Sequence, residues 1–580
     1  MKIKKDTITN LLVAFIIFLA VSVALCFISF NNDNPLGRLL REIDLRYGDE
    51  RFEYRNDRGK SPRPPDDLAI LAIDEKSVNE LGRWPWSRKV FADFINKLSE
   101  YQPKVVAFDI VNSEYSNEFD DNSLAEAVKN LTNPVLGYFF RDTESTELNQ
   151  EAYKQIKKSK INIVKQLEEP ESKYARNYQL YKSVELNIPE IGKSAKGFGF
   201  FNFQPDSDGI FRRAILTTKY DGGFFPSLSL EAFRQFVRGQ IIISLDRFGI
   251  HNLYVNKSEI PVSENGQLIL NFYGETGAIP TYSIVDVLNG EVETQKLRDK
   301  IVLIGATEIA IYDIRPSPLD NIFPGIELQA TAVANILTEN YLLKNNYTQS
   351  IDLILITAYS FILILLLFVV KRTITGVFIL TSLILIHIYS NYYVFEQFNF
   401  LLSGIFPILS LVLSFVFYEG YRNLVVEKRS RFLKRAFSSY VAPDIVNQII
   451  SNPDRLHLGG ENRVVTLLFS DIRGFTSLSE KTSPSQLVEI LNNYLNPMTR
   501  IVMENKGTLD KFIGDAVMAI YGAPFDLPMH GKYACETAVK MMKKLEELNR
   551  FFAEKQLPEI SIGIGINTGE AVVGNMGADI

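Results

Sequence analysis

The stretch VVTLLFSDIRGFT, residues 464–476, decides the fold of the C-terminal part of this chain. Its first six residues are apolar or β-branched and predict a buried β-strand. The strand ends in Ser470-Asp471-Ile472, and the following Arg473-Gly474 leads into a helical stretch. The sequence therefore predicts a carboxylate, that of Asp471, at the end of a buried strand and directly before a helix.

The downstream residues supply the elements that a small sheet needs. A helical pattern at 485–505 precedes two short strands joined tightly at Gly514-Asp515, and a second helix and a further strand follow. The order is strand, helix, hairpin, helix, strand, which predicts an α+β ferredoxin-like palm. Its later elements are expected at residues 507–513, 516–521, 532–554 and 559–566.

The palm places Asp471, at a strand end, beside Asp515, at the tip of the adjacent hairpin. An aspartate at a strand end is usually structural, but two converging carboxylates suit two hard divalent cations, which prefer oxygen ligands. Paired metals lower the pKa of an attacking hydroxyl and stabilise charge that develops on a phosphate. N–H groups at the start of the helix can bind phosphate oxygens. That helix is opened by Gly474, Phe475 and Thr476.

Three motifs closely resemble the class III nucleotidyl cyclase catalytic domain: FSDIRGFT at 469–476, KFIGDA at 511–516 and GIGINTG at 563–569. The resemblance implies that Asp471 and Asp515 bind two Mg²⁺ or Mn²⁺ ions and that Ile472 contributes its main-chain carbonyl. It also implies that the 3′-hydroxyl of the nucleotide attacks its own α-phosphate and releases pyrophosphate.

The purine-selecting position of this family corresponds to Lys511. Guanylyl cyclases place a glutamate there, which accepts hydrogen bonds from guanine. A lysine can only donate, which suits N1 of adenine. The alternative is an exposed hairpin lysine without a role in binding. We therefore expect an adenylate cyclase with ATP as substrate, and guanylate cyclase is the nearest alternative.

The family pattern continues beyond Gly569 through a second purine-selecting residue and a helix that carries an asparagine and an arginine. Active sites in this family form between two chains, so we expect a homodimer. The 580 residues contain no such helix, and the palm is C-terminally incomplete. Because the sequence stops within a motif, we expect an incomplete record of a cyclase. A natural truncation would instead favour a non-catalytic receptor whose palm dimerises or binds nucleotide.

Four charge-poor stretches have the ~20 apolar residues that a transmembrane helix needs: residues 11–30, 351–370, 373–395 and 401–418. The first follows three lysines and is too long for the core of a cleaved signal peptide, so we predict an uncleaved anchor. Basic residues before the first stretch, between the second and third, and after the fourth all lie on one side if both termini are cytoplasmic. We therefore predict a multi-pass protein of the bacterial inner membrane, with the block 31–350 outside.

The outer block alternates strands with helical stretches, which predicts an α/β sheet covered by helices. Strands are expected at 66–74, 105–111, 197–203, 215–218 and 301–305, with a helix at 90–98. Asp74, Asp109 and Asp206 are candidates for a ligand or cation site. A polar group at the end of a buried strand is more often a helix or turn cap.

Ile73-Asp74 and five further motifs of this block resemble the CHASE type 2 extracellular sensor domain. The five further motifs are GRWPWSR at 82–88, VAFDI at 106–110, FQPDSDGIFRR at 203–213, GAT at 305–307 and PGIE at 324–327. The resemblance implies one anchor before the sensor and three spans between it and a cytoplasmic output domain. It also implies an extracytoplasmic ligand, which the sequence does not identify.

The chain is thus predicted to be a multidomain membrane protein. Its parts are a cytoplasmic start and first span (1–30), the sensor (31–350), three spans (351–420), a helical linker (421–460) and the palm (461–580). With 62 basic and 68 acidic residues, the net charge of −6 gives no reason to expect a nucleic-acid partner. Only two cysteines occur, which excludes a disulfide framework and a cysteine zinc cluster.

Overall fold

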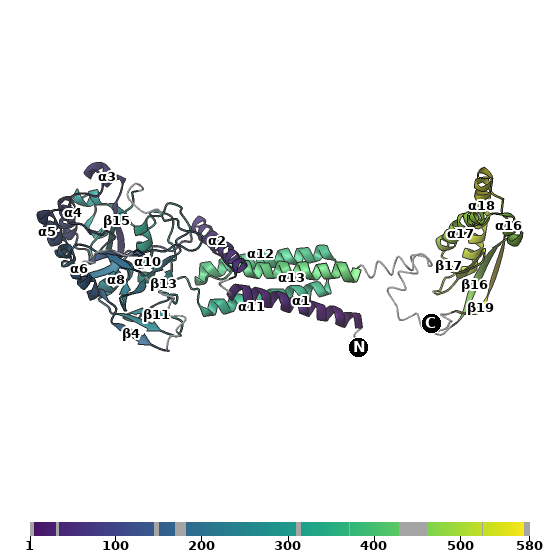
Figure 1. The fold of residues 1–580 in the computed structure, drawn as a ribbon, viewed down its shortest axis with the longest axis horizontal. Coiled ribbons are helices and arrows are strands. Elements are labelled where there is room, and N and C mark those ends of the chain that lie inside the picture. Colours follow the sequence, from purple (N-terminus) through teal and green to yellow (C-terminus); the bar gives the residue numbers. More distant parts are fainter. Residues whose placement is uncertain are drawn as a thin grey trace. The chain divides into compact units, whose positions relative to one another are not determined.

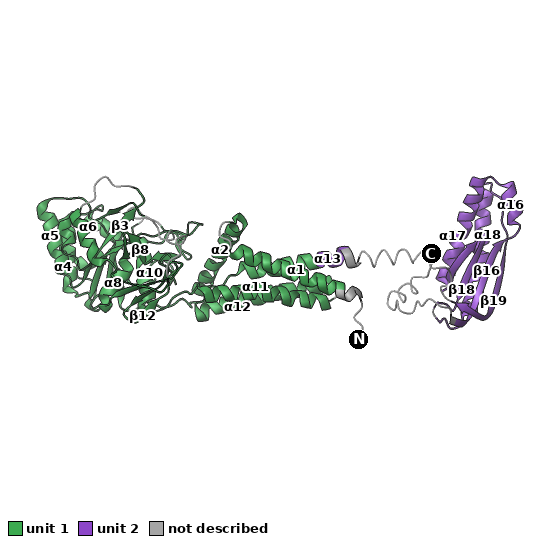
Figure 2. Cartoon of the chain, turned by 60° about the horizontal axis from the view of Figure 1, so that its bottom comes forward, with its two compact units in different colours: residues 1–418 green, residues 419–580 purple. Residues whose placement is uncertain are grey.

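The structure is a computed structural model (Figure 1) that describes residues 5–30, 34–143, 150–168, 181–308, 315–370, 372–427, 461–524 and 526–573. The chain divides into two compact units, residues 1–418 and 419–580 (Figure 2). Most of the linker predicted at 421–460 lies outside the described residues, and its helix stays a prediction.

The first unit is built on a seven-stranded sheet. Its six parallel strands run in the order β14 (Thr281–Ser283), β1 (Leu68–Ile73), β15 (Ile301–Ala306), β2 (Val105–Phe108), β3 (Pro134–Arg141) and β6 (Gly197–Phe200). β5 (Ser183–Glu185) pairs antiparallel with the end of β3. Strands such as β1, with the sequence LAILAI, are buried along their whole length, as expected for parallel strands covered on both faces. The predicted α/β sheet is confirmed.

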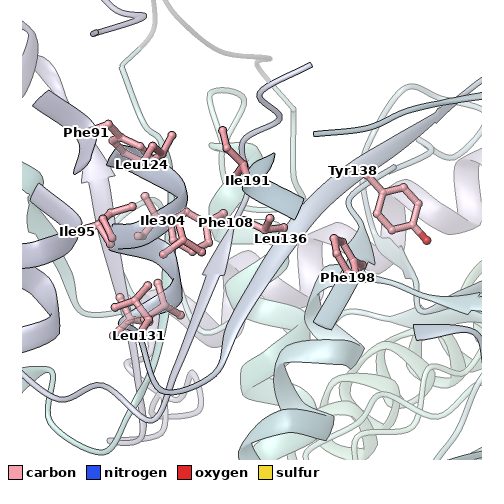
Figure 3. Packing of buried hydrophobic residues seen from close by; sticks show 14 of the residues in the cluster. Phe91, Ile95, Phe108, Leu124, Leu131, Leu136, Tyr138, Ile191, Phe198 and Ile304 are labelled. Atoms are coloured by element: carbon pink, nitrogen blue, oxygen red, sulfur yellow. The ribbon is translucent and has the colours of Figure 1, made fainter. Parts of the chain in front are cut away.

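Helices cover both faces of this sheet. α4 (Arg88–Glu100), α5 (Glu118–Lys129) and α9 (Ile284–Leu288) pack on one face, and Figure 3 shows Phe91, Phe108 and Leu124 in that core. α8 (Leu228–Val237) and α10 (Gly325–Thr338) cover the other face. The chain leaves β1 and β2 toward helices of the first face but leaves β15 toward α10 on the second. The connections therefore change sides at β15.

Shorter elements complete the outer part of this unit. β4 (Ile163–Gln166), β10 (Ile241–Leu245), β11 (Ile250–Val255) and β12 (Ser258–Ile260) form a second sheet. The strand predicted at 215–218 is two strands, β7 (Arg213–Ile215) and β8 (Thr217–Tyr220), because the chain changes partners from β13 (Gln267–Ile269) to β9 (Gly223–Pro226). Short helices lie at α3 (Glu75–Leu81), α6 (Gln150–Ile156) and α7 (Pro189–Gly192).

Among the residues that the structure describes, four helices are long and apolar enough to cross a membrane, as the sequence predicts. They are α1 (Lys5–Phe30), α11 (Asn346–Val369), α12 (Thr373–Phe398) and α13 (Ile405–Tyr421). The side chain of Asn345 caps the start of α11, and Asn399 ends α12 in the left-handed conformation. Both residues are small and polar, and both suit such helix ends.

A helix that was not predicted, α2 (Pro35–Asp57), follows the first span. The Asp44 carboxylate accepts hydrogen bonds from the N–H groups of Gly404 (2.8 Å) and Ile405 (3.0 Å), where α13 begins. The buried Arg51 guanidinium donates to Asn391 Oδ1 of α12 at 2.6 Å. One side of α2 is thereby fixed to two of the candidate spans.

Other residues of α2 bind the outer part of the unit. Arg55 donates to Asn271 Oδ1 (2.8 Å) and to the carbonyl of Phe272 (3.0 Å). Asp49 accepts two hydrogen bonds from the Arg212 guanidinium, at 2.7 and 2.5 Å. α2 therefore contacts both the candidate spans and the sheet-bearing part of the first unit through buried or half-buried charged groups.

The second unit is the predicted palm. Its strands β16 (Glu461–Ile472), β17 (Thr508–Ile513), β18 (Ala516–Tyr521) and β19 (Ile562–Val573) form an antiparallel sheet in the order β17-β18-β16-β19. α17 (Pro484–Glu504) and α18 (His530–Glu554) pack on one face, while α16 (Phe475–Lys481) follows β16. The two halves, β16-α17-β17 and β18-α18-β19, interleave as in ferredoxin-like folds. The α+β palm is confirmed.

Candidate active site

A tight hairpin turn positions Asp515. Ile513 of β17 pairs with Ala516 of β18, so Gly514 and Asp515 are the two central residues of the turn. Gly514 has φ +65°, a conformation that favours glycine at the first central position. The turn therefore needs glycine before Asp515 and leaves little freedom in where the carboxylate lies.

The hairpin tip is tied to the end of β16. The N–H of Ile472 donates to Asp515 Oδ2 at 3.0 Å, and the carboxyl groups of Asp515 and Asp471 interact directly. The pKa of Asp515 is raised, first because the side chain is buried and then because of the neighbouring charge of Asp471. The structure thus brings the two predicted carboxylates together in an arrangement that disfavours two negative charges.

The donor set around this pair fits a hard divalent cation. A cation between Asp471 and Asp515 would offset both the burial of the charge and the repulsion between the carboxylates. The described part of the chain contains no group of three or more His, Cys, Asp or Glu side chains that could hold a metal ion, so the aspartate pair would need further ligands from the main chain, substrate or water. Mg²⁺ is commonly bound by one or two carboxylates together with substrate phosphates and water, so a pair of carboxylates fits such an ion, and the ligand role of the Ile472 carbonyl stays a prediction.

Two contacts that the sequence did not reveal support the end of β16. Ser470 Oγ and the hydroxyl of Tyr494 on α17 lie 2.6 Å apart, both fully buried, and burial raises the pKa of Tyr494 to about 12. Arg473 crosses Gly563 of β19, where an added Cβ would lie 2.8 Å from Arg473 Nε. A larger residue at Gly563 would therefore displace the exposed Arg473 side chain beside the site.

Among the described residues, no hydrogen bond or ion pair joins the remaining predicted site residues to the aspartate pair. Lys511 follows an irregularity of β17 and pairs with Met518; its side chain is 62% exposed and lies 3.4 Å from Asp510 Oδ2. Gly474 has φ +68° and precedes α16, whose first two residues are Phe475 and Thr476. The purine-selecting role of Lys511 and the phosphate-binding role of this loop stay predictions.

The three aspartates that the sequence singles out as ligand candidates lie in different surroundings. Asp74 caps α3: its Oδ1 accepts from the N–H of Ser77 at 2.9 Å and from Ser283 Oγ at 2.8 Å. Asp206 accepts from Arg212 at 3.1 Å within the network that also holds α2. Asp109 lines a cavity.

Two protein families match the sequence, the CHASE2 domain at residues 16–370 and the adenylate and guanylate cyclase catalytic domain at residues 460–580. Adenylate cyclase 1 of Rhizobium meliloti (strain 1021) is 35% identical over 153 residues, which cover 26% of this chain and 23% of the relative. Adenylate cyclase of Anabaena cylindrica is 34% identical over 148 residues, 25% and 28% of the two chains. The solved guanylyl cyclase Cya2 is 40% identical, covers 21% of this chain and 62% of its own, and aligns with a TM-score of 0.21. The chain spans about a quarter of the length of the curated relatives it matches.

Proposed function

The chain belongs to the CHASE2 domain family and carries an adenylate and guanylate cyclase catalytic domain, and on this basis we propose that it is a membrane-bound sensor cyclase that converts ATP to cyclic AMP and pyrophosphate. The observation that carries the proposal is the contact between Asp471 and Asp515 at the end of β16, tied by the N–H of Ile472. Two adenylate cyclases among the similar proteins support ATP over GTP, as does a lysine at position 511.

The chemistry needs two oxygen-bound Mg²⁺ or Mn²⁺ ions, which Asp471, Asp515 and the carbonyl of Ile472 would hold. When bound, such ions lower the pKa of the ribose 3′-hydroxyl and stabilise charge on the α-phosphate. The chain's own part is to orient these ligands through the Gly514 turn and the Ile472 N–H. The 3′-hydroxyl gives up its proton to solvent as its oxygen forms a bond to the α-phosphorus, the bond between that phosphorus and the oxygen that bridges to the β-phosphorus breaks, and pyrophosphate leaves. Main-chain N–H groups at the start of α16 would bind phosphate oxygens.

A second copy of the palm is part of this proposal. Both long helices pack on one face of the sheet, and the alternation of β16 places Phe469, 40% exposed, on the opposite face together with Asp471. A homodimer that covers this face would enclose the aspartate pair between two chains. The cyclase family is typically dimeric, which supports this arrangement.

The outer domain would regulate the cyclase from outside the bacterial inner membrane, with both termini cytoplasmic. Support comes from α2, which bonds to α12 and α13 through Arg51 and Asp44 and to the outer domain through Asp49 and Arg55. A shift of the outer domain would therefore move α2 and the spans together.

The proposal is tested by measuring cyclic nucleotide formation by the solubilised full chain with ATP or GTP and Mn²⁺. We expect cyclic AMP from ATP and loss of product in Asp471→Asn. Asp526→Asn is the matched control, since that side chain is 96% exposed and bonds only to Arg463 among the described residues. Nucleotide binding without any cyclic product would favour the non-catalytic receptor, and a preference for GTP would favour guanylate cyclase.

A further inference from the structure

A cavity of about 350 Å³ opens in the first unit at the carboxyl ends of the parallel strands. Ile73 ends β1, Ala306 ends β15, and Asp109 directly follows β2, so three adjacent strands contribute to one wall. Gly325 and Ile326, the first residues of α10, form part of another wall. The volume of the cavity lies within the ~300–1,000 Å³ that is typical of small-molecule sites.

The topology of the sheet explains why a cavity forms here. The connections after β1 and β2 run to helices on one face, whereas the connection after β15, the strand between them, runs to α10 on the opposite face. Adjacent connections that diverge in this way leave a crevice at the carboxyl edge. Open α/β sheets bind their ligands at this switch point.

The wall chemistry combines apolar surface with one charge of each sign. Ile73, Trp84, Phe201 and Ile326 are apolar or aromatic, and Asp109 and Arg315 also line the cavity. The Arg315 guanidinium lies over the rings of Phe203 and Phe211, 5.0 and 5.5 Å from their centres. A cationic group and an anionic group on one small cavity, whose wall is partly polar and partly apolar, match a ligand that carries both charges and an apolar part.

The aromatic wall is held in place by its own packing. Trp84 meets Trp86 edge to face at 5.0 Å and Phe91 at 5.9 Å. Edge-to-face aromatic pairs of this kind stabilise one orientation of the ring. Trp84 therefore offers a fixed apolar surface to the cavity.

We propose that this cavity binds a small zwitterion with an apolar body, of the amino-acid class. Arg315 and the N–H groups at the start of α10 receive the carboxylate, Asp109 receives the ammonium group, and Trp84 and Ile326 contact the apolar body. The regulatory meaning rests on the proposed function, because the ligand would be the signal that the sensor cyclase reads. The binding itself does not depend on that function.

The chain offers a built-in reporter. It contains only two tryptophans, Trp84 in the cavity wall and Trp86 in contact with it. Tryptophan fluorescence of the solubilised full chain is measured during titration with L-leucine, L-methionine and L-phenylalanine. We expect a saturable change with at least one of them. 3-Phenylpropionate carries only the carboxylate, and 2-phenylethylamine carries only the ammonium group. The affinity of each should be lower than that of L-phenylalanine by a factor of about ten or more.

Variants separate the two charged contacts. Arg315→Gln and Asp109→Asn should each weaken amino-acid binding about tenfold or more, the loss expected for a hydrogen bond to a charged group. Arg315→Gln should leave 2-phenylethylamine binding nearly unchanged, and Asp109→Asn should do the same for 3-phenylpropionate. Arg298→Gln, at an exposed arginine outside the cavity, is the control that should bind like the unmodified protein.

The ligand series on the unmodified protein decides the proposal even where a variant fails to fold. Absence of a saturable change with all three amino acids overturns it, and so does equal binding of either singly charged analogue. Cyclic AMP formation is measured on the same preparation. Binding without cyclase activity contradicts the proposed function alone, and cyclase activity without binding contradicts this site alone.

Discussion

Replacing Asp515 by asparagine separates two roles of this side chain: accepting the hydrogen bond from Ile472 and carrying a negative charge that binds metal. Asparagine keeps an oxygen that can accept the hydrogen bond from the N–H of Ile472, 3.0 Å away in the unmodified protein. It removes a charge that burial and the neighbouring Asp471 disfavour, as the raised pKa of Asp515 indicates. A raised pKa in the folded state means that stability is lost as the pH rises through that pKa. At neutral pH the metal-free Asp515→Asn protein should therefore unfold at the same temperature as the unmodified protein or at a higher one.

The stabilisation of the protein by bound metal, in contrast, should be smaller in Asp515→Asn than in the unmodified protein. A cation bound only by the folded state stabilises it by roughly 2.7 kcal/mol at about 100 times its Kd. For a unit of this size, ~1 kcal/mol corresponds to about 2–4 °C, so Mn²⁺ should raise the midpoint of the palm by roughly 5–11 °C. Asp515→Asn loses one of the two carboxylates of the site, so most of this shift should disappear. Cyclase activity should fall by about 10²–10³ or more.

Calorimetry of the solubilised full chain with and without Mn²⁺, together with a cyclic AMP assay, measures both effects. Asp526→Asn is the control and should keep the Mn²⁺ shift and the activity, because its side chain is 96% exposed. The reasoning is refuted if Asp515→Asn lowers the metal-free midpoint by several degrees or retains the full Mn²⁺ shift.

Three further predictions address specificity, coupling and pH. Lys511→Glu should shift the ATP-to-GTP preference toward GTP by about 10–100-fold, since glutamate accepts where lysine donates. Arg212→Gln should destabilise the first unit by about 3–5 kcal/mol, because the 8% exposed guanidinium bonds to Asp49 and Asp208 at 2.5–2.8 Å; tryptophan-detected unfolding measures it. Burial raises the pKa of Glu327 to about 7, so the first unit should lose stability as the pH rises from ~4.5 through about 7, and Glu327→Gln should remove this dependence in the same assay.

Each of these has its own control. Lys532→Glu, at an exposed helix lysine, should not change the preference for ATP over GTP. An unchanged preference in Lys511→Glu would contradict the assignment of Lys511 as the purine-selecting residue. Arg247→Gln removes a guanidinium with 54% exposure and should barely change unfolding; an equal loss in both arginine variants would contradict the network. A pH profile that is the same with and without Glu327 would show that another group sets it.

Sequence reasoning succeeded where the pattern is local. The first six residues of the opening stretch predict β16 because they are apolar and bounded by a turn, and the four spans follow from length and composition. The convergence of Asp471 and Asp515 followed from element order alone, since a hairpin beside a strand end brings them together.

The sequence did not predict contacts between residues that are distant from each other along the chain. α2 carries many charged residues and resembles an exposed helix, yet Asp49 meets Arg212 across 163 positions and Arg51 meets Asn391 across 340. The Ser470–Tyr494 contact and the division of 215–218 into β7 and β8 likewise depend on tertiary pairing. An exposed charged residue and a buried, hydrogen-bonded one are the same residue type in the sequence. Hydrophobic periodicity therefore cannot distinguish the two.

The most direct test of the central claim is cyclic nucleotide formation by the protein purified from its native membrane. Product is measured from ATP and from GTP, with and without Mn²⁺, beside the Asp471→Asn variant. The account predicts cyclic AMP from ATP that requires the divalent cation and disappears in Asp471→Asn. Absence of any metal-dependent cyclic product, or an undiminished rate in Asp471→Asn, would contradict it.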